Sequence, residues 1–97
     1  MTQNLYEKYE YEGGLLGWEQ DLDRTFMKKN YKFATFEECQ QFVLKVGVFA
    51  DSIDHHPEWT LSDDGKTVDV KLTTHSAGNR VTLMDYKLAE KMNEINS

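Results

Sequence analysis

Residues 54–75, DHHPEWTLSDDGKTVDVKLTTH, predict a β-hairpin. Trp59-Thr60-Leu61 starts one extended segment, and Thr67 to Thr74 alternates apolar and polar side chains as a half-buried strand does. Asp64-Gly65, between the two segments, is a pair that tight hairpin turns favour. Because a residue before proline is pushed out of the α region, we expect His56 to be extended. The hairpin would form part of an antiparallel sheet.

A long amphipathic helix is predicted immediately before the hairpin. Thr35-Phe36-Glu37-Glu38 fits a capping box, in which Thr35 caps the helix and Glu38 reaches back. Apolar side chains then recur every three or four residues, as one face of a helix requires. These side chains are Phe36, Cys39, Phe42, Val43, Val46, Phe49, Ala50 and Ile53. A second amphipathic helix is expected from Thr82 to Asn96, with Thr82 and Asp85 at the same cap spacing.

Two further extended segments are predicted near the start of the chain. Leu15 to Trp18 is interpreted as a short strand followed by an acidic turn. Arg24 to Phe33 is interpreted as a strand whose apolar and polar side chains alternate. Antiparallel strands with helices between them predict an α+β fold, with about four strands and two to three helices on one face. Residues 1–97 would form one domain, and residues 1–14 either a short helix or a mobile segment.

The composition excludes several classes of protein. The chain has 97 residues and a net charge of −6, with its 11 basic residues scattered, so direct binding of nucleic acid is not expected. A single cysteine, Cys39, rules out a disulfide within the chain and a cysteine-rich zinc site. No apolar run approaches the roughly 20 residues that span a bilayer. A polar, acidic N-terminus without a signal peptide favours a cytoplasmic location, with the nucleus as a second location.

The three histidines form the candidate site. His55 and His56 precede one strand of the hairpin and His75 follows the other, so antiparallel pairing brings them to one edge of the sheet. The residues alone leave three interpretations open. The histidines could cap a helix end beside Asp51 and Asp54, could bind a metal, or could transfer protons. Adjacent side chains of an extended chain point in opposite directions, which disfavours a shared metal ion for His55 and His56.

The pattern around these histidines resembles that of the pterin-4a-carbinolamine dehydratases. The resemblance rests on the run Asp54-His55-His56-Pro57-Glu58-Trp59, on Asp51 four positions before His55, and on Thr74-His75 after the alternating strand. It continues through Gly78, Thr82 and Asp85 into Lys87-Leu88-Ala89, and it covers about residues 15 to 96. The individual motifs are short, but their combined spacing is specific.

The resemblance implies an activity and an assembly. Members of the family remove water from 4a-hydroxytetrahydrobiopterin to give quinonoid dihydrobiopterin, which recycles the cofactor of aromatic amino-acid hydroxylases. They use no metal and no organic cofactor. A homotetramer, built as a dimer of dimers, and a hydroxylase in the same pathway are therefore expected as partners. The alternative function is that of a protein-interaction module, because vertebrate members act as dimerization cofactors of a homeodomain transcription factor.

The resemblance also implies site residues. It makes His55, His56 and His75 the catalytic acid–base set, without assigning which is the acid and which the base. It implies a second set of residues that line the pterin or orient the imidazoles. This set comprises Asp51, Asp54, Pro57, Trp59, Thr73, Thr74, Ser76 and Asp85.

Overall fold

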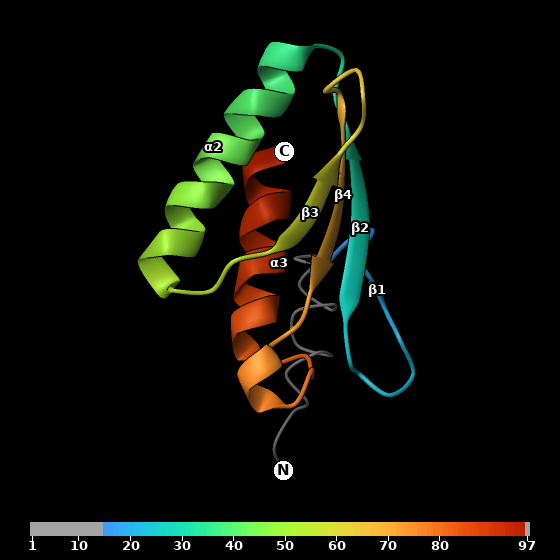
Figure 1. The fold of residues 1–97 in the computed structure, drawn as a ribbon, viewed down its shortest axis with the longest axis vertical. Coiled ribbons are helices and arrows are strands. Elements are labelled where there is room, and N and C mark those ends of the chain that lie inside the picture. Colours follow the sequence, from blue (N-terminus) through green and yellow to red (C-terminus); the bar gives the residue numbers. More distant parts are fainter. Residues whose placement is uncertain (1–14, 97) are drawn as a thin grey trace.

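A four-stranded antiparallel sheet and two α-helices make up the fold, in a computed structural model that describes residues 15–96. The strands are β1 (Glu19–Gln20), β2 (Met27–Lys32), β3 (Glu58–Leu61) and β4 (Thr67–Leu72), in the spatial order β1-β2-β4-β3. The helices are α2 (Phe36–Ile53) and α3 (Leu83–Asn96), with a short 3₁₀ helix, η1 (His75–Ala77), before α3. Figure 1 shows both α-helices on the same face of the sheet. The α+β prediction is confirmed, and the segment expected in residues 1–14 lies outside the described residues.

The central strands show the alternation that the sequence predicts. Val68, Val70 and Leu72 of β4 are buried, whereas Asp69 and Lys71 are exposed. In β2 the buried Met27 and Tyr31 are paired with Leu72 and Val68, so the two strands present one continuous apolar face. Because successive side chains of a strand point to opposite faces, the charged residues lie on the other face of the sheet.

Helix α2 begins at the predicted cap. The Thr35 hydroxyl accepts a hydrogen bond from the Glu38 N–H at 3.1 Å. The Glu38 carboxylate reaches back one residue further than a standard capping box requires, and accepts from the Ala34 N–H at 3.2 Å. Cys39, Phe42, Val46 and Ala50 are buried against the sheet, which confirms the interpretation of Cys39 as a core residue.

Helix α3 packs beside α2 and completes the core. Its buried side chains include Leu88, Ala89 and Met92. The sequence predicts that Thr82 and Asp85 pair at the start of this helix. One hydrogen bond of this pairing is present, in which Asp85 Oδ2 accepts from the Thr82 N–H at 2.9 Å. None of the helices described in residues 15–96 has the length and apolar character needed to cross a membrane.

The predicted strand from Leu15 to Trp18 is wrong. Residues 15–17 form a turn closed by a hydrogen bond from the Trp18 N–H to the Leu15 carbonyl at 3.0 Å, and the strand begins at Glu19. Leu15 and Trp18 are both buried, whereas Leu16 is exposed. Burial at a spacing of three is the signature of a turn rather than of a strand, in which buried residues alternate.

The predicted strand from Arg24 to Phe33 is shorter in the structure. Arg24 has a φ of 57°, in the left-handed region, and β2 starts only at Met27. The Asp21 carboxylate holds this loop, since it accepts from the Thr25 N–H at 2.7 Å, from the Phe26 N–H at 2.9 Å and from the Thr25 hydroxyl. This local capping by an aspartate competes with strand pairing.

Candidate active site

The end of α2 sets the direction of the His55-His56 pair. Asp54 adopts the left-handed conformation, with φ 52° and ψ 44°. Its N–H bonds to the Asp51 carbonyl at 3.2 Å, and the His55 N–H bonds to the Ala50 carbonyl at 3.0 Å. These two bonds are those of a Schellman motif, which reverses the chain at a helix C-terminus. Asp54 therefore acts on the site through its backbone, and its side chain is exposed.

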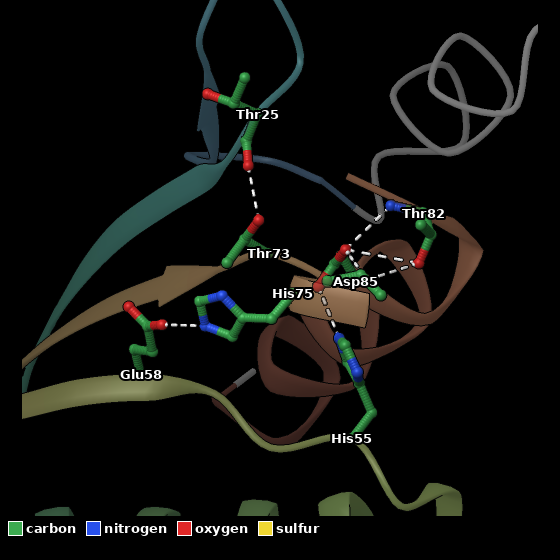
Figure 2. A network of polar contacts seen from close by, with 8 residues as sticks. Thr25, His55, Glu58, Thr73, His75, Thr82 and Asp85 are labelled. Atoms are coloured by element: carbon green, nitrogen blue, oxygen red, sulfur yellow. Dashed lines mark hydrogen bonds and ion pairs between the residues drawn. The ribbon is translucent and has the colours of Figure 1, made fainter. Parts of the chain in front are cut away.

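His55 points inward to a buried carboxylate. Its Nε2 donates to Asp85 Oδ1 at 2.6 Å, and the Asp85 side chain has no exposed surface. The other oxygen, Oδ2, accepts from the Thr74 hydroxyl at 2.8 Å and from the Thr82 N–H (Figure 2). Residues from three segments thus fix one carboxylate. With Nε2 bonded in this way, Nδ1 is the nitrogen of His55 that remains free of hydrogen bonds to residues 15–96.

His56 points the other way. Its Nε2 lies 2.6 Å from Asp51 Oδ1, and the side chains of both residues are exposed, His56 by 56% and Asp51 by 77%. The opposite directions of His55 and His56 are those expected for adjacent residues of an extended chain. The structure therefore brings Asp51 to His56 rather than to His55.

His75 lies between two oxygen acceptors. Its Nε2 is 2.6 Å from Glu58 Oε1, and its Nδ1 is 2.6 Å from Asn79 Oδ1. The pKa of His75 is raised, first by the hydrogen bond with Asn79 and then by the bond with Glu58, whose charge acts in the same direction. Slight desolvation and the positive charge of Lys71 oppose this rise.

The hairpin register explains why these groups lie close together. Glu58, the first residue of β3, pairs with Lys71 near the end of β4. The residues before Glu58 therefore run beside those that follow Lys71, and Figure 2 shows the side chains of His55 and His75 at the same end of the sheet. Each ring points to its own carboxylate, His55 to Asp85 and His75 to Glu58.

The remaining candidate residues differ in their surroundings. Thr73 is buried and its hydroxyl donates to the Thr25 carbonyl at 2.6 Å, which ties the β1–β2 loop to β4. Trp59 is half-buried and packs against the core. Ser76 is exposed in η1. Pro57 is half-buried beside the site.

An open groove of about 1100 Å³ lies next to the site, over the sheet face opposite the helices. Its lining includes Pro57, Glu58 and Trp59 at the end nearest the histidines, and Lys28 and Lys71 from the central strands. None of the three histidines lines it. The groove therefore meets the candidate site at Pro57, Glu58 and Trp59.

No cluster of three or more histidine, cysteine, aspartate or glutamate side chains suited to a metal ion occurs within residues 15–96. Each histidine instead has one carboxylate beside it, and these carboxylates come from different elements. Metal-free chemistry stays a prediction, and metal analysis of the purified protein tests it.

The sequence did not single out Glu58 or Asn79 as functional residues. Glu58 stands within the quoted motif, but its contact with His75 depends on the exact register of the hairpin. Asn79 has a φ of 58°, so its role depends on a loop conformation that the sequence does not specify. An asparagine directly after Gly78 was the available signal, because both residues tolerate left-handed backbone.

Comparisons with known proteins give a consistent result. A family model described as Pterin 4 alpha carbinolamine dehydratase matches residues 2–95. A protein from Chelativorans sp. (strain BNC1) is 38% identical over 96 residues, which cover 96% of this chain and 95% of that protein. One from Bordetella avium (strain 197N) is 43% identical over 82 residues, covering 84% and 73%. Both carry the provisional name pterin-4-alpha-carbinolamine dehydratase.

A solved structure is also similar over its full length. It is the crystal structure of a transcriptional coactivator/pterin dehydratase from Brucella melitensis, with a TM-score of 0.79 and 35% sequence identity. The match covers 100% of both chains.

Proposed function

The chain belongs to the pterin 4 alpha carbinolamine dehydratase family, and on that premise we propose that it removes water from 4a-hydroxytetrahydrobiopterin. The family and the names of its relatives make the protein an enzyme, a dehydratase. The proposed product is quinonoid dihydrobiopterin.

The proposed reaction needs two proton transfers. The bond between C4a and the hydroxyl oxygen breaks, and hydroxide is a poor leaving group unless a proton is donated to it. A proton leaves a ring nitrogen as the C=N bond forms, so one substrate gives one product and one water. An acid and a base at fixed positions accelerate such steps. Because the transfers complete the reaction, the proposal includes no metal and no organic cofactor.

The observation that carries the proposal is the pair of differently held imidazoles at one end of the sheet. His55 is bonded through Nε2 to the buried Asp85, so the lone pair of Nδ1 is available whenever the ring is neutral. A histidine oriented by a carboxylate in this way is a suitable base. His75 has acceptors at both nitrogens. We assign His55 the role of base and His75 that of acid.

His56 has a less constrained position, because its contact with Asp51 is exposed. We keep it in the proposed catalytic set because the resemblance to the family implies that role. We also keep a second set as proposed substrate contacts or orienting groups. This set comprises Asp51, Asp54, Pro57, Trp59, Thr73, Thr74, Ser76 and Asp85.

The proposal is tested by following the decay of enzymatically generated carbinolamine in the ultraviolet. We expect His55→Ala and His75→Ala each to lose about 10²–10⁴-fold of the acceleration, the usual contribution of one acid or base. A smaller loss is expected for His56→Ala. Asp63→Asn, at the exposed far end of the hairpin, is the control and keeps wild-type activity. Decay at the uncatalysed rate with wild-type protein would reject the proposed function.

A wider setting follows from the same proposal. An aromatic amino-acid hydroxylase is the proposed source of the carbinolamine, and the proposed location is the cytoplasm. The proposed assembly is a homotetramer. Its support is the pair Leu44 and Val48 on α2, which are exposed by 61% and 72% although both are large and apolar.

A second candidate function is protein interaction. The similar Brucella melitensis structure is described as a transcriptional coactivator as well as a pterin dehydratase. The exposed apolar positions of α2 are the surface that such a function would use. Variants that keep full dehydratase activity but lose a partner in a two-protein binding assay would separate this function from catalysis.

A further inference from the structure

We propose that Glu58 is a positioning residue of the reaction, which together with Asn79 holds His75 as a doubly protonated ring. The inference rests on the proposed function, since it makes His75 the source of the proton that the leaving hydroxyl receives. The Nδ1 proton leaves its bond with Asn79 as it passes to the hydroxyl, and the neutral ring that remains keeps its Nε2–H bond to Glu58. Glu58 is the first residue of β3, and His75 is the first residue of η1.

The loop after η1 brings Asn79 back to His75. Gly78 and Asn79 both have left-handed backbone, with φ values of 80° and 58°. The Gly78 N–H bonds to the His75 carbonyl at 3.0 Å, and the Asn79 N–H bonds to the Thr74 carbonyl at 3.1 Å. These bonds curl the loop so that the Asn79 side chain faces Nδ1 while Glu58 faces Nε2.

Two acceptors require two donors. A neutral imidazole has one N–H, so one of its nitrogens would place a lone pair against an oxygen at 2.6 Å. The imidazolium has N–H groups at both positions and satisfies both oxygens. The charge of Glu58 also favours the imidazolium, and Lys71 across the hairpin opposes it. The geometry and the raised pKa of His75 therefore both indicate that the ring is doubly protonated.

His55 differs from His75, because its Nε2 is bonded to Asp85 and its Nδ1 has no hydrogen bond to residues 15–96. One imidazole with a nitrogen left open and one with acceptors at both nitrogens suit the roles of a base and an acid in one site. Glu58 would thus act through His75, and the reaction needs no direct contact between Glu58 and the pterin.

The test separates this role from a structural one by measuring the protonation of His75 directly. The variants are Glu58→Gln, which removes the charge and keeps the shape, and Glu58→Asp, which keeps the charge but shortens the reach. Asp63→Asn removes an exposed carboxylate from the other end of the hairpin and is the matched control. Nuclear magnetic resonance follows the titration of His75 in each free protein, and kcat/KM is measured against pH.

We expect His75 to titrate at lower pH in Glu58→Gln than in wild type, and the alkaline limb of kcat/KM to move in the same direction. Glu58→Asp should lie between them, and Asp63→Asn should match wild type. The loss in Glu58→Gln should be smaller than that in His75→Ala, which is about 10²–10⁴-fold. An unchanged His75 titration, or an unchanged alkaline limb, overturns the role of Glu58.

Failure of the proposed function has a different signature. Wild-type protein would then fail to accelerate carbinolamine decay, whereas the titration of His75 would still respond to Glu58→Gln. If the wild-type enzyme is active but the titration of His75 is the same in Glu58→Gln, the proposed function is retained and this inference is rejected.

Discussion

Each histidine of the chain lies 2.6 Å from a carboxylate, but the three pairs differ in burial. Asp85 is fully buried beside His55, whereas Asp51 and Glu58 are 77% and 49% exposed. Exposed ion pairs contribute little to stability, because water screens them. Removing the partner of a buried carboxylate is more costly, because a charge is then left without compensation. Substitution of His55 is therefore expected to affect both folding and chemistry.

The raised pKa of His75 predicts a pH-dependent stability. When the pKa of a group is higher in the folded than in the unfolded chain, its stabilising effect is full below the unfolded pKa, about 6.5 for histidine. The effect disappears as the pH rises through the folded pKa. We therefore expect wild type to be more stable than His75→Gln at about pH 6, and this advantage to vanish in alkaline solution.

Urea unfolding of both proteins across this pH range is the measurement. His56→Gln is a suitable control, because within residues 15–96 only one nitrogen of His56, Nε2, has a hydrogen-bond partner. A difference between wild type and His75→Gln that grows with rising pH contradicts the prediction.

At the scale of elements, two turns depend on glycines with positive φ angles. Gly65 lies in the turn at the hairpin tip, and Gly78 lies in the loop that follows η1. Gly65 has a φ of 68°, and a Cβ placed on it would clash with the Phe36 ring. Gly78 has a φ of 80°, but a Cβ there would meet nothing within 4 Å. The two glycines share one backbone requirement and differ in the space around them.

This contrast predicts two different losses of stability. Gly78→Ala should lower the free energy of unfolding by about 1–2 kcal/mol, the cost of a left-handed alanine. Gly65→Ala should lower it further, because the new methyl also displaces the Phe36 ring. A double-mutant cycle with Phe36→Ala isolates the contact. Equal losses in the two single variants would show that the ring moves aside at no cost.

The elements that were predicted correctly are those with two independent local signals. Helix α2 has a cap at Thr35 and a long apolar periodicity, and β4 has strict alternation next to a turn. Residues 15–18 had only a short apolar run, which a turn and a strand share, and the strand prediction was wrong. For the site, the convergence of His55 and His75 followed from antiparallel pairing alone. The Glu58 contact did not, because long-range register decides it.

At the scale of the whole molecule, the helix layer keeps large apolar side chains exposed on its outer side. Leu44 and Val48 lie one helical turn apart on α2, where side chains are neighbours. Figure 1 shows α2 at the edge of the helix layer. A chain this small buries a limited share of its surface, so an assembly of several copies would add buried apolar area.

If copies of the chain associate through α2, Leu44→Lys and Val48→Lys should reduce the mass of the assembly in solution. Light scattering coupled to gel filtration measures this mass, and circular dichroism checks that the helices remain. Leu22→Lys is the control, because Leu22 is fully exposed on the β1–β2 loop, outside the helix layer. An unchanged mass in both α2 variants would remove α2 from the proposed interface.

The single thiol of the chain, Cys39, has a practical consequence. Its side chain is fully buried between α2 and the sheet, and burial raises its pKa, with the charge of Asp64 adding to the effect. Thiolates rather than thiols react with alkylating reagents, so the folded protein should be labelled very slowly. Labelling must then wait until the helix separates from the sheet. The rate of alkylation in native buffer therefore reports how often this core opens, without any engineered probe.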